Sequence, residues 1–347
     1  MVKTWGALPL RTEPTEGTGA ETTQVERSSV EQVFTLIKQD LDQALQLFPN
    51  NNFPEGRFFW SRPSANALKA DVYLWTGKRL NGGQSDFSEA LESLNEIETS
   101  NVSLLPDFAD VFEFENKGNE EILMAVRFDE FEGGNNYFRD MYIIGSAIPT
   151  NIDSETRAVI GPIGGGSNNI VVPTTYTKSL FAQEDSRRDV SFFEIYTQND
   201  QGGSDYYTSI VLKGSGTVFG GGRQFKDDII LYRYAEVLLL RAEAKNALGQ
   251  DPSPELNQVR QRAYGHHFEN YRFVPGSQEE NNEAILEERL RELAFEGKRW
   301  WDLIRFGKAI KMLPTLQNKE NPEHLLIWPI SSNVLSLENK ISQNPGY

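Results

Sequence analysis

The sequence contains no cysteine, three histidines and four methionines in 347 residues. Without cysteine, the chain cannot form disulfide bonds, thiolate nucleophiles, cysteine-ligated zinc sites or iron–sulfur clusters. Long hydrophobic runs are also missing, because no stretch approaches the roughly 18 apolar residues of a membrane-spanning helix. The opening segment "MVKTWGALPLRTEPTEG" has no apolar core. The sequence as written therefore predicts neither a signal peptide nor a lipid-bearing cysteine.

Positive charge is scarce as well. The chain has 34 lysines and arginines against 50 aspartates and glutamates, which gives a net charge of −16. Such a charge repels nucleic acid and anionic lipid and argues against both as partners, whereas neutral ligands such as sugars meet no such repulsion. Aromatic residues make up 11% of the chain. The length suffices for one large domain or two ordinary ones, with a sizeable core.

Helical periodicity is clear in the first third of the chain. Apolar residues recur at spacings of three and four, and each run is bounded by capping or breaking residues. The expected helices run from Ser28 or Ser29 to Pro49, from Pro63 to Gly77, and onward from about Asp86. Residues 1–27 are expected to be extended.

The pattern changes after about residue 100. The stretch "EEILMAVRF" (120–128) predicts a short strand, and residues 131–226 are rich in glycine, asparagine and serine, with short apolar runs between them. Nearly a hundred loop-like residues inside a compact domain are unusual, and such insertions are often functional. We therefore expect the insertion to carry the ligand surface.

Helices return in the last third. One is expected over 229–249, a second begins with Ser253 as its cap, and a third follows the capping-box pair Ser277 and Glu280. A further helix is expected from Trp300 to Pro314, after a break at Gly297. The pair over 229–263 has close to the 34-residue length of a tetratricopeptide hairpin. The predicted fold is mainly α, with tetratricopeptide-like helix pairs and a large loop-rich insertion that contains short strands.

Charges surround two adjacent tryptophans in "EERLRELAFEGKRWWDLIRFGKA" (287–309), without a nucleophile, histidine or cysteine. Trp300 and Trp301 cannot share one helix face, so we expect one to enter the core and the other to cover a neighbouring helix, with Arg299 or Arg305 stacked or paired nearby. Packing is favoured over an aromatic ligand platform. Ion pairs along the helix surface are expected at spacings of three and four among Glu287, Glu288, Arg289, Arg291 and Glu292.

The segment "RELAFEGKRWWDLIRFGKA" closely resembles a hallmark of the SusD-like (SusD/RagB) family of Bacteroidetes outer-membrane nutrient-binding lipoproteins. Its characteristic residues here are Arg299, Trp300, Trp301, Asp302 and Arg305. Four further segments resemble the family in the same order along the chain: "SRPSANALKADVYLWTGK" (61–78), "ILYRYAEVLLLRAEAKNALG" (230–249), "NQVRQRA" (257–263) and the ending "LLIWPISSNVLSLENKISQNPGY".

The resemblance implies one domain over residues 1–347, with a helical flank (1–130), a variable ligand-facing insertion (131–226) and a helical C-terminal flank (227–347). It implies a non-catalytic, cofactor-free protein at the outer-membrane surface that captures a glycan or other nutrient and passes it to a SusC-like TonB-dependent transporter. "WGALPL" (5–10) resembles a segment that family members reach only after a long N-terminal helical region. We therefore expect a truncated member that exposes some apolar surface.

Sugar recognition needs rings for the apolar C–H faces of the sugar and polar side chains for its hydroxyls. The stretch "EGGNNYFRDMY" (132–142) and the tyrosine pair at 206–207 supply that mixture, although the same rings could instead pack the insertion onto the helices. The candidate ligand residues are Asn136, Tyr137, Arg139, Tyr142, Tyr206 and Tyr207.

The sequence gives less support to a metal site, a phosphate-binding loop or a serine nucleophile. Adjacent His266 and His267 point in different directions and His324 stands apart, so no metal site is expected. The glycine-rich runs lack the lysine and spacing of a phosphate loop, and no G-x-S-x-G motif is present. Two alternatives stay open. A glycan-active hydrolase would need two carboxylates at a set separation, and a protein-binding helical scaffold would need an exposed apolar groove.

Overall fold

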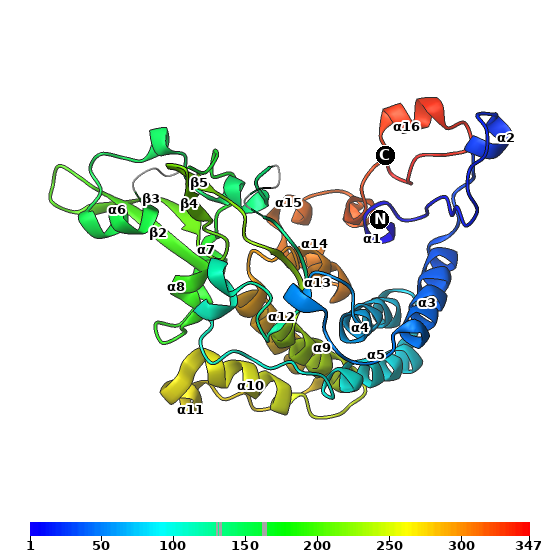
Figure 1. Ribbon diagram of the computed structural model, residues 1–347, viewed down its shortest axis with the longest axis horizontal. Coiled ribbons are helices and arrows are strands. Elements are labelled where there is room, and N and C mark those ends of the chain that lie inside the picture. Colours follow the sequence, from blue (N-terminus) through cyan, green and yellow to red (C-terminus); the bar gives the residue numbers. More distant parts are fainter. Residues whose placement is uncertain (130, 132–133, 162–164) are drawn as a thin grey trace.

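The computed structural model describes residues 1–129, 131, 134–161 and 165–347. The helices gather on one side of the molecule, and most strands lie in the insertion on the other side (Figure 1). The N-terminal part contains α1 (Val2–Trp5), α2 (Ala20–Thr23), α3 (Val30–Leu47), α4 (Arg62–Arg79) and α5 (Gly83–Ile97). The prediction of a mainly helical fold is confirmed.

The middle of the chain carries short elements. They are β1 (Ile122–Val126), α6 (Ser154–Ile160), α7 (Thr175–Ser179), α8 (Arg187–Ser191), β2 (Phe192–Gln198), β3 (Ser204–Val211), β4 (Thr217–Phe219) and β5 (Gly222–Gln224). The C-terminal part contains β6 (Ile229–Arg233), α9 (Tyr234–Ala247), α10 (Ser253–Tyr264), α11 (Phe268–Tyr271), α12 (Gln278–Leu293), α13 (Arg299–Arg305), α14 (Ala309–Met312), α15 (Pro314–Gln317) and α16 (Ser332–Leu337).

Local sequence signals set the ends of the long helices. Ser29 and Gln32 form a capping box at the start of α3, and Ser277 and Glu280 form another at the start of α12, as predicted. Pro63 lies in the first turn of α4, where its missing N–H costs no helical hydrogen bond.

The helical core has two main apolar clusters. In the first, α4, α5 and α9 pack against one another, and Ala67, Ala70 and Leu74 are fully buried there. The second cluster joins α1, α3, α4, α12 and α13 and includes Trp75. The antiparallel neighbours α4–α5 and α9–α10 are the helix pairs that the sequence predicts.

The insertion leaves and re-enters the helical body at one place, because β1 and β6 pair antiparallel on either side of it. It has a small core of its own, which includes Tyr142, Ile195, Ile210 and Phe225. In the described part of the chain the strands form three two-stranded sheets, β1–β6, β2–β3 and β4–β5.

Several predicted boundaries are wrong. The helix expected over 229–249 begins only at Tyr234, because the apolar run at 229–233 pairs with β1 as a strand. Ser253 is the first residue of α10 rather than its cap, and it donates to Asp251. The last predicted helix is divided into α13 and α14 at Gly307, whose φ is +67°. Residues 1–27 include the short helices α1 and α2.

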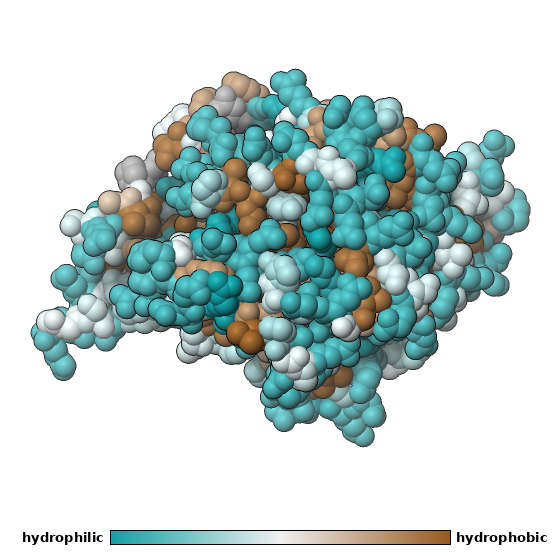
Figure 2. Space-filling view, turned by 90° about the horizontal axis from the view of Figure 1, so that it is seen from below, coloured by the Kyte–Doolittle hydropathy of each residue, from teal (hydrophilic) through white to brown (hydrophobic). Residues whose placement is uncertain are grey.

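The surface agrees with the acidic composition. The face seen from below is mostly hydrophilic, and hydrophobic residues appear there in small separate groups (Figure 2). Among the described residues, no helix combines the length and hydrophobicity needed to cross a membrane.

Candidate functional site

A cleft of about 810 Å³ lies where the insertion joins the helical body. Four segments line it: the loop before α4, the turn before β1, the residues that follow β1 and Asp228 before β6. Its rings are Phe58, Phe59, Phe114 and Phe128; its acids are Glu55, Glu115, Asp129 and Asp228; and its cations are Lys117 and Arg127. The cleft therefore combines apolar ring surfaces with hydrogen-bonding groups, as ligand pockets generally do.

Arg57 fixes the loop before α4. Its side chain is buried and donates to the carbonyl oxygens of Glu120, Ile122 and Asn101 at 3.0, 2.7 and 2.9 Å. Its guanidinium also lies 4.1 Å from the centre of the Phe53 ring. The loop is thereby tied to the start of β1, and the adjacent Phe58 and Phe59 are held at the edge of the cleft.

Two glycines allow this loop to approach the turn before β1. Gly118 has φ of +69°, and a Cβ atom there would lie 2.7 Å from the carbonyl oxygen of Gly56 and 2.9 Å from its Cα. No side chain fits at that distance. The closeness of the two backbones sets the width of this side of the cleft.

Lys117 and Asp228 form the floor of the cleft. The Lys117 ammonium donates to the Phe128 carbonyl at 2.8 Å, lies 3.4 Å from Asp228 Oδ1 and sits 4.1 Å from the centre of the Phe114 ring. The Phe128 N–H donates to the same Asp228 oxygen at 3.0 Å. These contacts hold the backbone of Phe128 and place the Lys117 ammonium against the Phe114 ring.

The opposite side of the cleft is more exposed. Phe58 and Phe59 lie in tilted contact with ring centres 4.7 Å apart, and Phe59 is 61% exposed. Arg127 lies 5.0 Å from the Phe58 ring and pairs with Asp129 at 2.7 Å. The backbone N–H of Phe131 and the Arg127 guanidinium lower the pKa of Asp129. Asp129 is therefore an ionised acceptor at neutral pH.

None of the six residues predicted from the sequence lines this cleft. Asn136 and Tyr142 are buried, contrary to the expectation of ligand contact. The Asn136 side chain caps the following turn by accepting from the Phe138 N–H and donates to the Asp227 carbonyl at 2.7 Å. The Tyr142 hydroxyl donates to the Ile160 carbonyl at 3.1 Å.

The other four predicted residues reach the surface in two groups. Tyr137 and Arg139 lie in one short turn, and the Tyr137 hydroxyl donates to the Phe295 carbonyl at 3.2 Å. Tyr206 and Tyr207 lie on β3 and are each 45% exposed. Tyr206 meets Tyr196 of β2 edge-on, with ring centres 5.8 Å apart. The rings of this second group stay a proposal as secondary ligand contacts.

The sequence did carry a signal for the cleft. Three consecutive aromatic residues, Phe58 to Trp60, sit in a polar loop outside any helical period, and such exposed rings are unusual. The contacts that assemble the cleft are not local. Arg57 ties the loop to the start of β1, and pairing of β1 with β6 brings Asp228 to the same place, and sequence spacing reveals neither contact.

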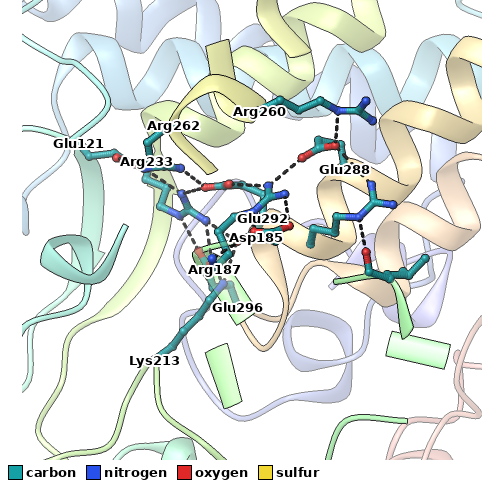
Figure 3. Close-up of polar contacts among 12 residues, drawn as sticks. Glu121, Asp185, Arg187, Lys213, Arg233, Arg260, Arg262, Glu288, Glu292 and Glu296 are labelled. Carbon is teal, nitrogen blue, oxygen red and sulfur yellow. Dashed lines mark hydrogen bonds and ion pairs between the residues drawn. The ribbon is translucent and has the colours of Figure 1, made fainter. Parts of the chain in front are cut away.

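A buried ionic network lies between the insertion and the helical body (Figure 3). Arg187 of α8 pairs with Asp185, Glu288 and Glu292, and Arg233 pairs with Glu292 and with two other glutamates. The side chains of Arg187, Arg233, Glu288 and Glu292 are fully buried. Because Arg187 belongs to the insertion and the two glutamates belong to α12, the network joins the insertion to the helices.

The prediction of ion pairs along residues 287–292 is confirmed for the spacing of two pairs, because Arg291 pairs with Glu287 at a spacing of four and with Glu288 at a spacing of three. Its placement on the helix surface is wrong for three of the five residues. Glu288, Arg289 and Glu292 are buried and also pair with other elements. Burial opposes ionisation of Glu288, but Arg187 and its neighbouring arginines outweigh it and lower the pKa to about 2.

The residues around the two tryptophans form a second buried group. Arg305 pairs with Glu243, Asp302 and Asp71, and Arg289 also reaches Asp302 at 2.8 Å. Both tryptophans pack in the apolar cluster with α3 and α4, where Trp301 meets Trp75 edge-on at 6.3 Å. This region holds helices together.

Comparison with known proteins gives this architecture a family. The family model described as "SusD family" matches residues 194–347. A SusD superfamily protein from Bacteroides vulgatus has a solved structure that is 30% identical, with a TM-score of 0.85, over 100% of this chain and 76% of that one. The chain belongs to the SusD family.

Other relatives agree with this assignment. SusD-like protein P38 of Formosa agariphila is 26% identical over 376 residues, which cover 99% of this SusD-like chain and 70% of the relative. A solved structure named as a laminarin binding SusD-like protein is 25% identical, with a TM-score of 0.78, over 100% of this chain and 75% of that one. The prediction of the family from its five sequence segments is confirmed.

Proposed function

We propose that this SusD-like protein binds an oligosaccharide or polysaccharide in the cleft between the loop before α4 and the residues after β1. The observation that carries the proposal is the set of phenylalanine rings that line the cleft beside carboxylates and two cations. Rings cover the apolar faces of a sugar, while carboxylates accept from its hydroxyls and Arg127 donates to them. The similarity to a laminarin binding SusD-like protein supports a glucan as the first ligand to test.

Family membership extends the proposal to the cell. SusD-like proteins act at the outer membrane surface of Bacteroidetes, and we infer that this one presents its glycan to a SusC-like TonB-dependent transporter. We infer binding without catalysis from the likeness to a laminarin binding SusD-like protein, and the lowered pKa of Asp129 suits an acceptor of sugar hydroxyls.

Calorimetric titration with a panel of neutral oligosaccharides, including laminarihexaose and maltohexaose, tests the proposal. Replacing Phe59 by alanine should weaken binding of the preferred oligosaccharide about tenfold, equivalent to ~1.4 kcal/mol. Because this ring is 61% exposed, the melting temperature should change little. Unchanged affinity in the Phe59→Ala variant would rule out the cleft.

Two further measurements separate the rival interpretations. Tyr206→Ala removes an exposed ring of β3 outside the cleft, so binding should persist; a loss there alone would assign the ligand to the insertion. Chromatography of the oligosaccharide after prolonged incubation should recover it intact. Shortened products would instead establish a hydrolase.

A further inference from the structure

A second pocket, of about 210 Å³, lies among α7, α12, α13 and α14 and shares no lining residue with the phenylalanine cleft. These four elements lie next to one another in the middle of the molecule (Figure 1). Tyr176 of α7 forms one wall with a ring that is 44% exposed, and Leu286 and Met312 contribute apolar surface. The volume suits one sugar residue or a smaller ion better than a long chain.

Arg299, a cation of this pocket, differs from the arginines of the buried ionic network in its hydrogen-bond partners. Arg299 is partly buried, and one of its Nη atoms donates to the Leu286 carbonyl at 2.9 Å. In the part of the chain that the structure describes, no carboxylate forms an ion pair with Arg299, whereas the buried Arg187 and Arg233 each have several. A guanidinium carries five donors, so Arg299 retains hydrogen-bonding capacity toward the pocket. Burial lowers its pKa, but it remains charged.

The acids of the pocket are already engaged elsewhere. Glu287 pairs with Arg291 at 3.3 Å, and Glu283 pairs with Lys308 at 3.2 Å. Lys308 is further held by Glu279 at 2.6 Å. Another lining lysine, Lys311, is exposed and makes no side-chain ion pair with any described residue. Three cations and two carboxylates therefore line the pocket, and among the described residues Arg299 and Lys311 form no ion pair with a carboxylate, in a chain whose net charge is −16.

We propose that this pocket binds a single anionic group, the carboxylate or sulfate ester of one sugar residue, through Arg299 and Lys311. The planar guanidinium matches two oxygens of a carboxylate or sulfate, and charge-assisted hydrogen bonds of this kind are about twice as strong as neutral ones. The Tyr176 ring then covers the apolar face of the same sugar. The glycans accepted by the protein accordingly include a negatively charged unit, recognised apart from the neutral units in the phenylalanine cleft.

Titration with glucuronic acid, with glucose and with inorganic sulfate, followed by protein NMR, tests the proposal. The two sugars share a ring and differ at the carboxylate, so glucuronic acid should bind at least tenfold more tightly than glucose. Competition by sulfate would show that the anion alone suffices. Sulfate binding without a preference for glucuronic acid over glucose would overturn the assignment to a sugar residue.

Substitutions of the lining cations test whether the anion binds at Arg299 and Lys311. Lys311→Ala should weaken glucuronic acid binding severalfold, and Arg299→Lys should do so more strongly because lysine keeps the charge but loses the paired donors. Lys319→Ala, which removes an exposed lysine outside the pocket, is the matched control. Since Lys311 is exposed, its variant tests the proposal even where the Arg299 variant lowers the melting temperature.

The proposals for the phenylalanine cleft and for the anionic pocket can be refuted independently of each other. Phe59→Ala should leave glucuronic acid binding unchanged, while Lys311→Ala should leave neutral oligosaccharide binding unchanged. Equal affinity for glucuronic acid and glucose, or equal losses in Lys311→Ala and Lys319→Ala, would refute the anionic pocket without touching the proposed role of the phenylalanine cleft.

Discussion

At the scale of single residues, the stability of the protein depends strongly on Glu292. One of its carboxylate oxygens accepts from Arg233 at 2.5 Å and also from Arg262, and the other accepts from Arg187 at 3.1 Å. A glutamine would keep the shape but remove the charge and direct N–H donors toward arginine donors. We expect Glu292→Gln to lower the free energy of unfolding by about 3–5 kcal/mol, because buried positive charges lose their partner.

Urea denaturation measures this loss. The matched control is Glu287→Gln on the same helix, where the pair with Arg291 is 3.3 Å long and the glutamate side chain is 44% exposed. An exposed pair contributes at most about 1 kcal/mol. If both variants lose the same stability, the buried network does not hold the insertion against the helices.

Asp227, by contrast with Glu292, is a single buried carboxylate that lowers the stability of the folded protein at neutral pH. Burial raises its pKa from 3.8 to about 6, and its carboxyl accepts from the Gly216 N–H at 3.0 Å. Between pH 3.8 and 6 the folded state binds a proton that the unfolded state does not bind. The contribution of Asp227 to stability therefore falls as the pH rises through this window and is a penalty at pH 7.

Replacing Asp227 by asparagine should remove that penalty, because the amide oxygen can still accept from Gly216. We expect the variant to be more stable than the parent by roughly 1–3 kcal/mol at pH 7, and by much less at pH 4. Urea denaturation of both proteins at the two pH values tests the prediction. A stability difference that does not change with pH would exclude Asp227 as its source.

At the scale of elements, the turn before β1 controls the cleft. Because a Cβ atom on Gly118 would meet the Gly56 backbone at 2.7 and 2.9 Å, Gly118→Ala must displace the loop that carries Phe58 and Phe59. We expect oligosaccharide affinity to fall at least tenfold and the free energy of unfolding to fall by about 1–3 kcal/mol.

The control separates collision from backbone strain. Gly221 has φ of +82°, and a Cβ atom there meets nothing within 4 Å, so Gly221→Ala carries a similar conformational cost without a collision. Its oligosaccharide affinity should match that of the parent in the same calorimetric titration. Loss of affinity in Gly221→Ala but not in Gly118→Ala would contradict the proposed geometry.

The helices and strands also show which parts of the fold can be predicted from the sequence. Helices with capping boxes and an apolar period, such as α3 and α12, were predicted because their signals are local. The run at 229–233 was assigned to a helix, since a short apolar segment looks the same in either state until β1 pairs with it. The cleft is not predicted for a related reason, because its lining segments meet through the long-range contacts of Arg57 and through the pairing of β1 with β6.

At the scale of the whole molecule, charge placement differs from what periodicity suggests. Spacings of three and four in residues 287–292 indicated a solvated helix face, yet the same residues connect α12 to α8, α10 and β6. A fully buried glutamate cannot be told from an exposed one without its partners. The insertion and the helices are therefore joined by ions as well as by apolar packing, and we expect them to unfold together.

Acid unfolding tests this connection. The arginines around Glu288 lower its pKa from 4.5 to about 2 against the effect of burial, and Glu292 and Glu296 are lowered in the same way. As the pH falls below 4.5, the unfolded state binds protons before the folded state does. The stability from these carboxylates is present above pH 4.5 and is lost as the pH falls toward 2.

Circular dichroism between pH 6 and 2 should therefore show one transition, below about pH 4, with the same midpoint for helical signal and aromatic signal. Six of the twelve tyrosines lie in the insertion and all six tryptophans lie outside it, so the tyrosine part of the aromatic signal reports on the insertion. In Glu288→Gln the remaining stability should depend less steeply on pH between 4.5 and 2, because one titrating group is gone. An aromatic transition well above the helical one would mean that the insertion separates from the helices before they unfold, and that the network does not join them.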